Sequence, residues 1–295
     1  MSPPQRLRAL LRKPGILQMP CCFDPLSAKL VEAANFPVTF VSGFSIAAAN
    51  GLPDTGLFSY GEMEATMRKV TSALDCIPCI GDGDTGYGNA VNAKRTVRGY
   101  ARAGLAGMMI EDQVAPKRCG HTRDKSVVDR ETAVARVRAA VDAAHETAAE
   151  AYGSTDHALV IVARTDALKT HGLDEALERA CRFREVGADV CFVEAPTSVE
   201  QMRTICESVD GPKMANCLAG GLTPVLPPAE LEEIGFKLAA YPLDLLNASI
   251  LAQRRALEGL RATGLPPKED TLPFAELQAA VGFPKYYEEE EKYRV

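Results

Sequence analysis

Four joints in the sequence have the same form: a helical stretch ends at glycine or asparagine, and an apolar run follows at once. They are EAANFPVTFVSGF, ARAGLAGMMIEDQ, REVGADVCFVEAP and EEIGFKLAAYPL. The residue just after each helical stretch is one that readily adopts the left-handed conformation of a helix C-cap. These residues are Asn35, Gly104, Gly187 and Gly235. Continuous apolar runs are typical of parallel strands buried on both faces. The joints therefore predict repeated helix–strand units around a parallel sheet.

Four further stretches, GILQMPC, IPCIG, ALVIVARTD and PKMAN, fit strands and bring the total to about eight, as in an α/β barrel. Helices fit between them, one capped by Asn89 with Ala93 and Val97 on its apolar face, another capped by Asp129. No linker-like break interrupts the units. The prediction is a single α/β domain over residues 1–295, a (β/α)8 TIM-type barrel. A doubly wound open sheet is the structural alternative.

Composition excludes several classes of partner. The chain has 295 residues, 46% of them hydrophobic, with a net charge of −6 and no basic stripe, so no nucleic acid is expected. No apolar run reaches the ~18 residues that a membrane span requires, and the N-terminus lacks a secretory signal pattern. Nine cysteines, scattered singly through apolar segments, fit reduced thiols and a cytoplasmic location. An organelle reached by a since-removed leader is the alternative.

Polar side chains follow most of the expected strands. A barrel of this type carries its chemistry at the C-terminal ends of its strands, so these residues indicate an active site there. Some of them are expected to be plain caps or salt bridges. The set is Ser42, Gly43, Asp82, Asp84, Glu111, Asp112, Arg164, Glu194, Asn216, Tyr241 and Pro242.

The stretch GDGDTGYG allows two interpretations. Its glycines satisfy the G-x-G-x-x-G dinucleotide pattern, but the charges of Asp82 and Asp84 would repel a pyrophosphate. Two carboxylates in a glycine-rich turn suit a hard cation better, and Mg²⁺ needs few carboxylates besides water and substrate oxygens. Asp82, Asp84 and Glu111 are therefore candidate metal-site residues. Solvated acids in an ordinary turn are the alternative.

Two cysteine patterns differ in their setting. Cys76 and Cys79 have redox spacing, but they lead into a buried strand, so both are expected to be core thiols. Cys119 lies in a long polar segment with Lys117, Arg118 and His121. Nearby cations favour a thiolate or allow proton delivery to a substrate. Cys119 is therefore a candidate catalytic residue, with Lys117 and His121 beside it, although many loop cysteines are incidental.

Six motifs, in order along nearly the whole chain, resemble the isocitrate lyase and phosphoenolpyruvate mutase superfamily: FVSGFSIAAANGLPDTG, GDGDTGYGN, IEDQVAPKRCGH, VARTDA, FVEAP and ANCLAGGLTP. The resemblance implies an α/β barrel that uses Mg²⁺, with Mn²⁺ as an alternative ion. It also implies a homotetramer in which a C-terminal helical extension, here residues 270–295, is swapped between subunits. The KRCGH segment is similar to the branch that cleaves carbon–carbon bonds.

The resemblance also implies a role for each matching residue. Asp82 and Asp84 would form the metal site, with Asp54 and Glu111 reaching the ion through water. Arg164 would bind the substrate's α-oxygen and carboxylate, Cys119 would be the acid, and the loop 114–128 would be a gate. The catalytic set is Cys119, Arg164, His121, Lys117 and Glu111. The substrate-binding set is Ser42, Gly43, Phe44, Arg164, Glu194, Asn216 and Pro242.

Three positions depart from, or discriminate within, the family pattern. Phe40 replaces a frequent tyrosine, and Ala219 stands where a charged residue is common. Pro242 matches the lyases, whereas relatives specialised for oxaloacetate hydrolysis tend to carry serine. Of the three, Pro242 alone favours a lyase over a dedicated hydrolase.

The resulting hypothesis is a Mg²⁺-dependent lyase that cleaves a 2-hydroxy dicarboxylate of the 2-alkylmalate type, such as 2,3-dimethylmalate, or a methylisocitrate-like tricarboxylate, with oxaloacetate hydrolysis as a side activity. The enzyme alternatives are a phosphoenolpyruvate or carboxyphosphonoenolpyruvate mutase and a dedicated oxaloacetate hydrolase. The non-enzyme alternatives are a metabolite-binding barrel and a thiol-redox protein based on Cys76 and Cys79.

Overall fold

The four joints have the backbone that the sequence predicts. The computed structural model describes residues 1–120 and 125–295. Asn35, Gly104, Gly187 and Gly235 have φ of 61°, 88°, 99° and 113°. A positive φ turns the chain out of a right-handed helix, and a buried strand follows each of these residues. The predicted helix–strand joints are confirmed.

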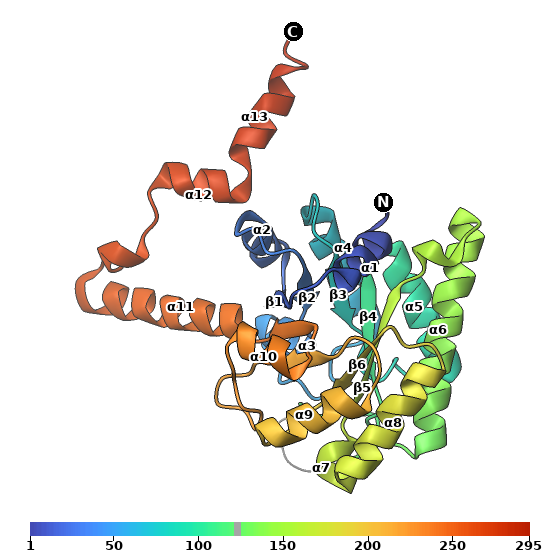
Figure 1. Cartoon of the computed structure of the whole chain (residues 1–295). Coiled ribbons are helices and arrows are strands. Elements are labelled where there is room, and N and C mark those ends of the chain that lie inside the picture. The colour runs from blue at the N-terminus through green and yellow to red at the C-terminus, as the bar shows by residue number, and fades with distance from the viewer. Residues whose placement is uncertain (121–124) are drawn as a thin grey trace. The chain divides into compact units, whose positions relative to one another are not determined.

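Eight parallel strands lie in the order β6-β5-β4-β3-β2-β1-β8-β7. A parallel bridge between Cys191 and Lys213 joins the two ends of this order, so the strands form a nearly closed barrel (Figure 1). The barrel prediction is confirmed, and the open sheet is excluded. The strands are β1 Leu17–Cys22, β2 Thr39–Val41, β3 Cys79–Asp82, β4 Gly107–Glu111, β5 Val160–Thr165, β6 Val190–Val193, β7 Met214–Asn216 and β8 Leu238–Tyr241.

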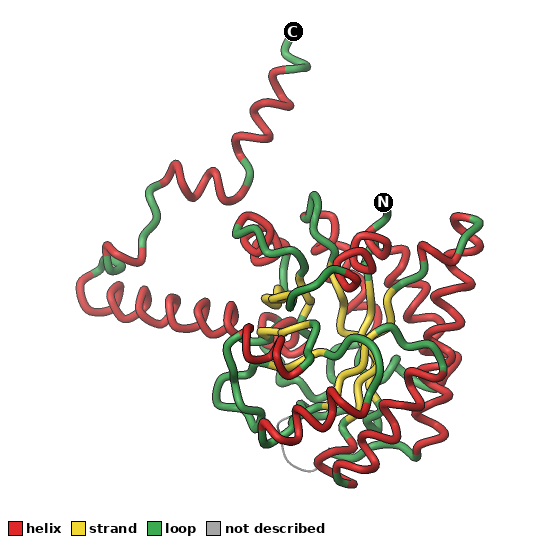
Figure 2. Tube along the Cα trace, viewed as in Figure 1, coloured by secondary structure: helices red, strands yellow, loops and turns green. Residues whose placement is uncertain are grey.

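Helices surround the strands, as the Cα trace in Figure 2 shows. Asn89 and Asp129 accept backbone N–H groups at the starts of α5 and α6, as predicted. The helices of this first unit are α1 Pro3–Arg12, α2 Pro25–Ala33, α3 Gly43–Ala49, α4 Tyr60–Ala73, α5 Ala90–Arg102, α6 Arg130–Tyr152, the 3-10 turn η1 Thr155–His157, α7 Ala167–His171, α8 Leu173–Glu185, α9 Val199–Ser208 and α10 Pro228–Ile234.

The core has two layers because alternate residues of each strand face opposite sides. One set points into the barrel and includes Met19, Phe40, Met109 and Phe192. Leu7 of α1 is fully buried in this inner cluster. The other set packs against the helices. Inner side chains near the carboxyl ends of the strands therefore form the floor under any site there.

The chain divides into two units, Met1–Leu243 and Asp244–Val295. The second contains α11 Asp244–Thr263, η2 Lys268–Asp270, α12 Phe274–Val281 and α13 Phe283–Glu291. This second unit starts at Asp244, whereas the predicted extension spans residues 270–295. Its role in oligomerisation stays a prediction. Among the described residues, no helix is both long and apolar enough to cross a membrane.

Candidate active site

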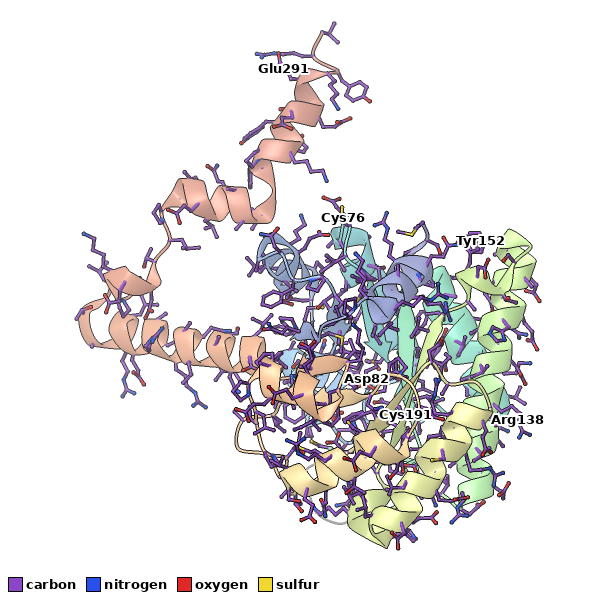
Figure 3. All side chains as sticks on the ribbon, viewed as in Figure 1. Cys76, Asp82, Arg138, Tyr152, Cys191 and Glu291 are labelled. Atoms are coloured by element: carbon purple, nitrogen blue, oxygen red, sulfur yellow. The ribbon has the colours of Figure 1, made fainter. Side chains whose placement is uncertain are left out.

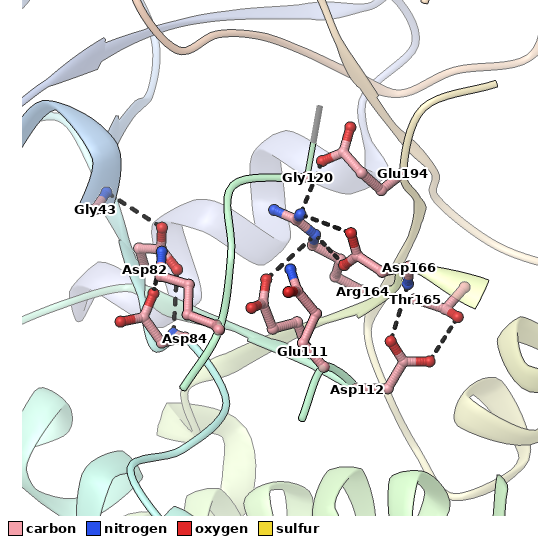
Figure 4. A network of polar contacts seen from close by, with 12 residues as sticks. Gly43, Asp82, Asp84, Glu111, Asp112, Gly120, Arg164, Thr165, Asp166 and Glu194 are labelled. Carbon is pink, nitrogen blue, oxygen red and sulfur yellow. Dashed lines mark hydrogen bonds and ion pairs between the residues drawn. The ribbon is translucent and has the colours of Figure 1, made fainter. Parts of the chain in front are cut away.

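Strand register places the key side chains next to one another. Glu111 on β4 lies opposite Arg164 on β5, and Arg164 lies opposite Phe192 on β6. The Arg164 guanidinium lies 5.4 Å from the Phe192 ring centroid, within cation–π range. Asp82 is the last residue of β3 and Asp84 follows that strand, and Figure 4 shows both beside this group. Polar residues as far apart in the sequence as Asp82 and Arg164 thus meet at one rim because they lie at or just after the ends of parallel strands.

Asp82 is the buried acid at the end of β3. Its carboxylate accepts the Gly43 N–H and the Asp84 N–H, both at 3.1 Å. Burial raises the pKa of Asp82 to about 6, and the charge of Asp84 adds to this effect. A Cβ on Gly43 would come within 2.7 Å of Asp82 Oδ2, so glycine is required for this contact. The pocket therefore holds an acid whose charge is costly without a cation nearby.

Lys117 supplies one such cation. Its Nζ lies 2.5 Å from Asp54 Oδ1 and 2.8 Å from Asp84 Oδ1. All three side chains are nearly buried. Although burial alone would lower the pKa of Lys117, the surrounding carboxylates, Asp84 foremost, raise it well above the usual value. Lys117 is therefore an ammonium ion in this site.

Glu111 differs from the other acids. Burial raises its pKa well above the usual value, and the charge of Arg164 opposes that shift. Its Oε2 lies 3.3 Å from Arg164 Nε. Among the described residues, its buried Oε1 has no hydrogen-bond partner. A buried oxygen of this kind calls for water, a cation or a substrate group.

Arg164 is held by three carboxylates. Besides Glu111, its Nε lies 2.8 Å from Asp166 Oδ2 and its Nη2 lies 3.2 Å from Glu194 Oε2. The pKa of Arg164 is well above its usual value because these charges outweigh burial. A planar guanidinium fixed at several points can offer its remaining N–H groups to a substrate carboxylate in one orientation.

One pocket brings most of the predicted site together. It encloses about 640 Å³, counting its mouth, and lies above the inner barrel side chains. Its apolar floor includes Phe40, Met109 and Phe192. The predicted residues that line it are Ser42, Phe44, Asp54, Asp82, Glu111, Lys117, Cys119, Arg164, Glu194, Asn216 and Pro242.

Several predicted residues lie elsewhere. Asp84 pairs with Lys117 without lining the pocket, and the Gly43 N–H donates to Asp82. A bond from Gly43 to substrate would need that N–H to change partner. His121 lies outside the described residues. The prediction that Cys76 and Cys79 are both core thiols is right for Cys79 and wrong for Cys76, which is exposed (Figure 3).

The sequence pattern predicts no role for Asp166 or Lys125, and it predicts Asp112 only as one of several strand-end acids. Asp166 follows β5 directly, and Arg164 and Lys125 hold its pKa at about 2 even though burial raises it. Asp112 accepts hydrogen bonds from the Thr165 hydroxyl at 2.6 Å and the Asp166 N–H at 2.9 Å. The sequence feature that could have identified Asp166 is its position two residues after Arg164, at the end of an expected strand.

The acids of this rim fit a divalent cation. Within residues 1–120 and 125–295, no three His, Cys, Asp or Glu side chains converge as direct ligands of one ion. Mg²⁺ is usually held by one or two carboxylates, with water and substrate oxygens completing its shell. The raised pKa of Asp82 and the unsatisfied Glu111 Oε1 both indicate where positive charge or water would be favourable. The donor set is therefore compatible with a divalent cation that is held mostly through water.

Comparison with known proteins gives three close relatives. The chain is 36% identical to 2,3-dimethylmalate lyase of Eubacterium barkeri, covering 99% of both chains. It is 38% identical to the chloroplastic carboxyvinyl-carboxyphosphonate phosphorylmutase of Arabidopsis thaliana, covering 98% of this chain and 84% of that one. It is 37% identical to the petal death protein of Dianthus caryophyllus, covering 98% and 88%.

Solved structures agree with these relatives. Oxaloacetate acetylhydrolase bound to 3,3-difluorooxalacetate matches with a TM-score of 0.92 and 31% identity, over 99% and 97% of the two chains. A 2,3-dimethylmalate lyase of the PEP mutase/isocitrate lyase superfamily matches with a TM-score of 0.90 and 33% identity, over 99% and 96%. Phosphonopyruvate hydrolase complexed with oxalate and Mg²⁺ matches with a TM-score of 0.85 and 26% identity, over 99% of both.

The family model of phosphoenolpyruvate phosphomutase matches residues 7–261, which include every residue of the pocket described above. The strand-end acids, the arginine and the loop cysteine thus sit in a chain that is related to these enzymes over its whole barrel. This protein belongs to the phosphoenolpyruvate phosphomutase family, within the PEP mutase/isocitrate lyase superfamily.

Proposed function

We propose that the protein is a magnesium-dependent lyase that cleaves a carbon–carbon bond in a small 2-hydroxy dicarboxylate of the 2-alkylmalate type. The observation that carries the proposal is the composition of one pocket. Asp82 and Glu111, the Arg164 guanidinium and the Cys119 thiol all line it. Acid, cation and proton donor around one cavity are what a retro-aldol cleavage needs.

The substrate's polar end would bind near the rim. Arg164 offers N–H groups to the hydroxyl and carboxylate oxygens, where it offsets negative charge. Ser42 and Phe44 line the same pocket. Asp82 and Asp84, with Asp54 and Glu111 through water, would hold Mg²⁺, or Mn²⁺ in its place. The bound ion would make the substrate hydroxyl more acidic.

The cleavage itself balances with one proton accepted and one proton delivered by the protein. A carboxylate of the pocket takes the hydroxyl proton, directly or through water, and the hydroxyl oxygen becomes the carbonyl of an α-keto acid as the carbon–carbon bond breaks. The bonding pair stays on the second fragment as an enolic carboxylate. The Cys119 Sγ–H then gives its proton to that carbon, which leaves a thiolate beside the rim cations. Apolar floor residues such as Phe40 and Phe192 would take the alkyl groups.

Oxaloacetate hydrolysis is the second candidate. It is supported by the match to oxaloacetate acetylhydrolase, because a hydrated ketone resembles a tertiary alcohol at the cleaved carbon. Pro242 lines the pocket, and its carbonyl accepts the Ser45 hydroxyl at 3.1 Å. Because relatives specialised for hydrolysis tend to carry serine at this position, Pro242 favours the lyase.

A panel of substrates tests the proposal. Purified protein with Mg²⁺ is incubated with 2,3-dimethylmalate, 2-methylisocitrate, isocitrate, oxaloacetate and phosphonopyruvate, and products are followed by NMR. A lyase forms an α-keto acid and a second carboxylate from at least one alkylmalate, and EDTA abolishes the reaction. Turnover of phosphonopyruvate alone would instead identify a mutase or phosphonate hydrolase.

We also propose a homotetramer assembled through the second unit. Exposed apolar side chains are concentrated there, among them Phe274, Leu277 and Val281 on one face of α12. A large apolar surface on a single chain is typical of an interface with another subunit. A cytoplasmic location is the accompanying proposal, and it rests on nine cysteines that form no disulfide.

A further inference from the structure

Lys125 is a buried lysine that the proposed chemistry does not use. Its side chain is 1% exposed and that of Asp166 is 0% exposed. Lys125 Nζ lies 2.7 Å from Asp166 Oδ1 and donates a hydrogen bond of 2.8 Å to the Gly120 carbonyl. Burying an ammonium ion is costly unless it is paired and hydrogen-bonded, so this lysine is held at a specific place.

The acceptor of this lysine is itself fixed. Arg164 donates to Asp166 twice, from Nε at 2.8 Å and from Nη2 at 3.0 Å. The Asp166 N–H donates to Asp112 Oδ1 at 2.9 Å. The carboxylate is therefore anchored to the ends of β4 and β5, and Lys125 connects that anchor to a different segment.

That segment is the backbone beside Cys119. Gly120 is buried, and a Cβ placed on it would lie 2.4 Å from Arg164 Nη2 and 2.8 Å from Glu194 Cγ. The backbone at Gly120 thus packs directly against the arginine of the pocket, as Figure 4 shows. Since Cys119 is the preceding residue, any shift of Gly120 would move the backbone that carries the thiol.

Backbone hydrogen bonds that do not involve Lys125 hold the two ends of the surrounding loop together. Val114 N–H donates to the Ser126 carbonyl and Val128 N–H to the Asp112 carbonyl, each at 2.9 Å. These bonds fix the base of the loop. The Gln113 side chain accepts the Arg118 N–H at 2.9 Å and donates to the Arg118 carbonyl at 2.8 Å, so the chain is also held before Cys119, and Gly120 is left to other contacts. An ammonium group can donate to a carboxylate and a carbonyl at once, which a neutral apolar side chain cannot do.

We propose that Lys125 is a positioning residue whose ammonium ties the Gly120 carbonyl to Asp166 and so holds the Cys119–Gly120 backbone in place beside Arg164. The positional effect is independent of the reaction catalysed, whereas its effect on turnover rests on the proposed function. If the ion pair were purely structural, it would stabilise the fold but would not affect the position of Cys119.

The decisive measurement is the rate at which iodoacetamide alkylates Cys119 in the full chain without substrate, resolved by peptide mass spectrometry. Lys125→Met should accelerate this alkylation about tenfold, the factor expected from losing one charge-assisted hydrogen bond. Exposed Cys76 serves as the internal reference for the reagent, and Cys191, 1% exposed, reports global unfolding. Unchanged Cys119 alkylation in a variant that keeps Cys191 protected overturns the proposal.

Two further variants remove ambiguity. Lys169 lines the same surface hollow as Lys125 but is exposed, so Lys169→Met removes an equal charge and should leave the Cys119 rate unchanged. If Lys125→Met unfolds and exposes Cys191, the double variant Lys125→Met/Asp166→Asn is measured instead. It removes both charges of the buried pair, so no unpaired charge destabilises the fold. Faster Cys119 alkylation in the folded double variant supports the proposal, and an unchanged rate overturns it.

Turnover separates this inference from the proposed function. Because Asp166 and Glu194 still hold Arg164, Lys125→Met should lower kcat about tenfold with little change in KM. A merely structural role would instead move the melting temperature and leave kcat unchanged. If Cys119 alkylation accelerates while kcat stays at the wild-type value, the positioning role stands and the assignment of Cys119 as the proton donor fails.

Discussion

At the scale of single residues, the thiol of Cys119 carries the most specific prediction. Cys119→Ser should lower kcat by roughly 10²–10⁴-fold, the usual contribution of a general acid, because a serine hydroxyl is a far weaker proton donor. KM and metal affinity should change little, since the rim acids and Arg164 are untouched. Steady-state kinetics and calorimetric titration with Mg²⁺ measure these quantities.

The matched control is Cys76→Ser, which alters an exposed thiol outside the pocket and should leave kcat unchanged. Near-normal turnover in Cys119→Ser would remove the thiol from the mechanism. Loss of Mg²⁺ binding in the same variant would show instead that the substitution disturbs the acidic rim.

Gly120 allows a second prediction at this scale. In Gly120→Ala the added Cβ would meet Arg164 Nη2 and Glu194, so either the arginine or the backbone beside Cys119 must shift. We expect kcat/KM to fall about tenfold or more, because small displacements in an active site are costly. Gly61→Ala is the control, since nothing lies within 4 Å of its added Cβ. Equal kcat/KM in both variants would show that the close packing at Gly120 has no catalytic consequence.

At the scale of elements, the sequence predicts best what depends on neighbouring residues. Glycine or asparagine before an apolar run predicts the helix–strand joints correctly. Both the end of a helix and the burial of the following strand depend on residues that are neighbours in the sequence. Residues at strand ends could be assigned to one rim because parallel strands share a direction. The pairing of Lys125 with Asp166 depends on how a loop folds back across 41 positions, and no local pattern encodes it. The prediction for Cys76 is wrong because this residue is exposed in the loop before β3, which begins only at Cys79.

The contact between α6 and α8 gives a pH-dependent prediction. Arg130 on α6 and Arg179 on α8 both donate to Glu175, and Arg179 also pairs with Asp112 at 3.0 Å. The hydrogen bond from Arg130 is the main reason that the pKa of Glu175 falls from 4.5 to about 2. A carboxyl group whose folded pKa is lowered contributes stability above its unfolded pKa and loses it as pH falls through the folded value.

Glu175→Gln should therefore be less stable than the wild type at pH 7, by about 1 kcal/mol for a partly exposed charged hydrogen bond. The difference should shrink as the pH falls from 4.5 towards 2. Urea unfolding at a series of pH values measures it. Glu178→Gln, whose carboxylate is more exposed and 3.4 Å from Arg130, should show a smaller effect. A difference that is constant across the pH range would mean that the ion pairs at Glu175 add nothing.

At the scale of the whole molecule, the barrel and the second unit differ in how far they bury their apolar side chains. The barrel buries its apolar residues within one chain, in an inner cluster and an outer layer under the helices. The second unit leaves apolar side chains exposed, with Phe274 72% and Phe283 41% accessible. Such residues cost free energy in water unless another surface covers them. A chain of this kind is expected to reach its lowest free energy as an oligomer.

The last prediction tests that expectation. Light scattering after size exclusion should give the wild type the mass of four 31.7 kDa chains. Phe274→Glu/Phe283→Glu should shift the distribution to smaller species, because burying two carboxylates in an apolar interface is unfavourable. Glu288→Lys, which changes an exposed charge on α13, should retain the wild-type mass. A wild type that runs as a single chain, or a double variant that keeps the mass of four, would contradict assembly through this unit.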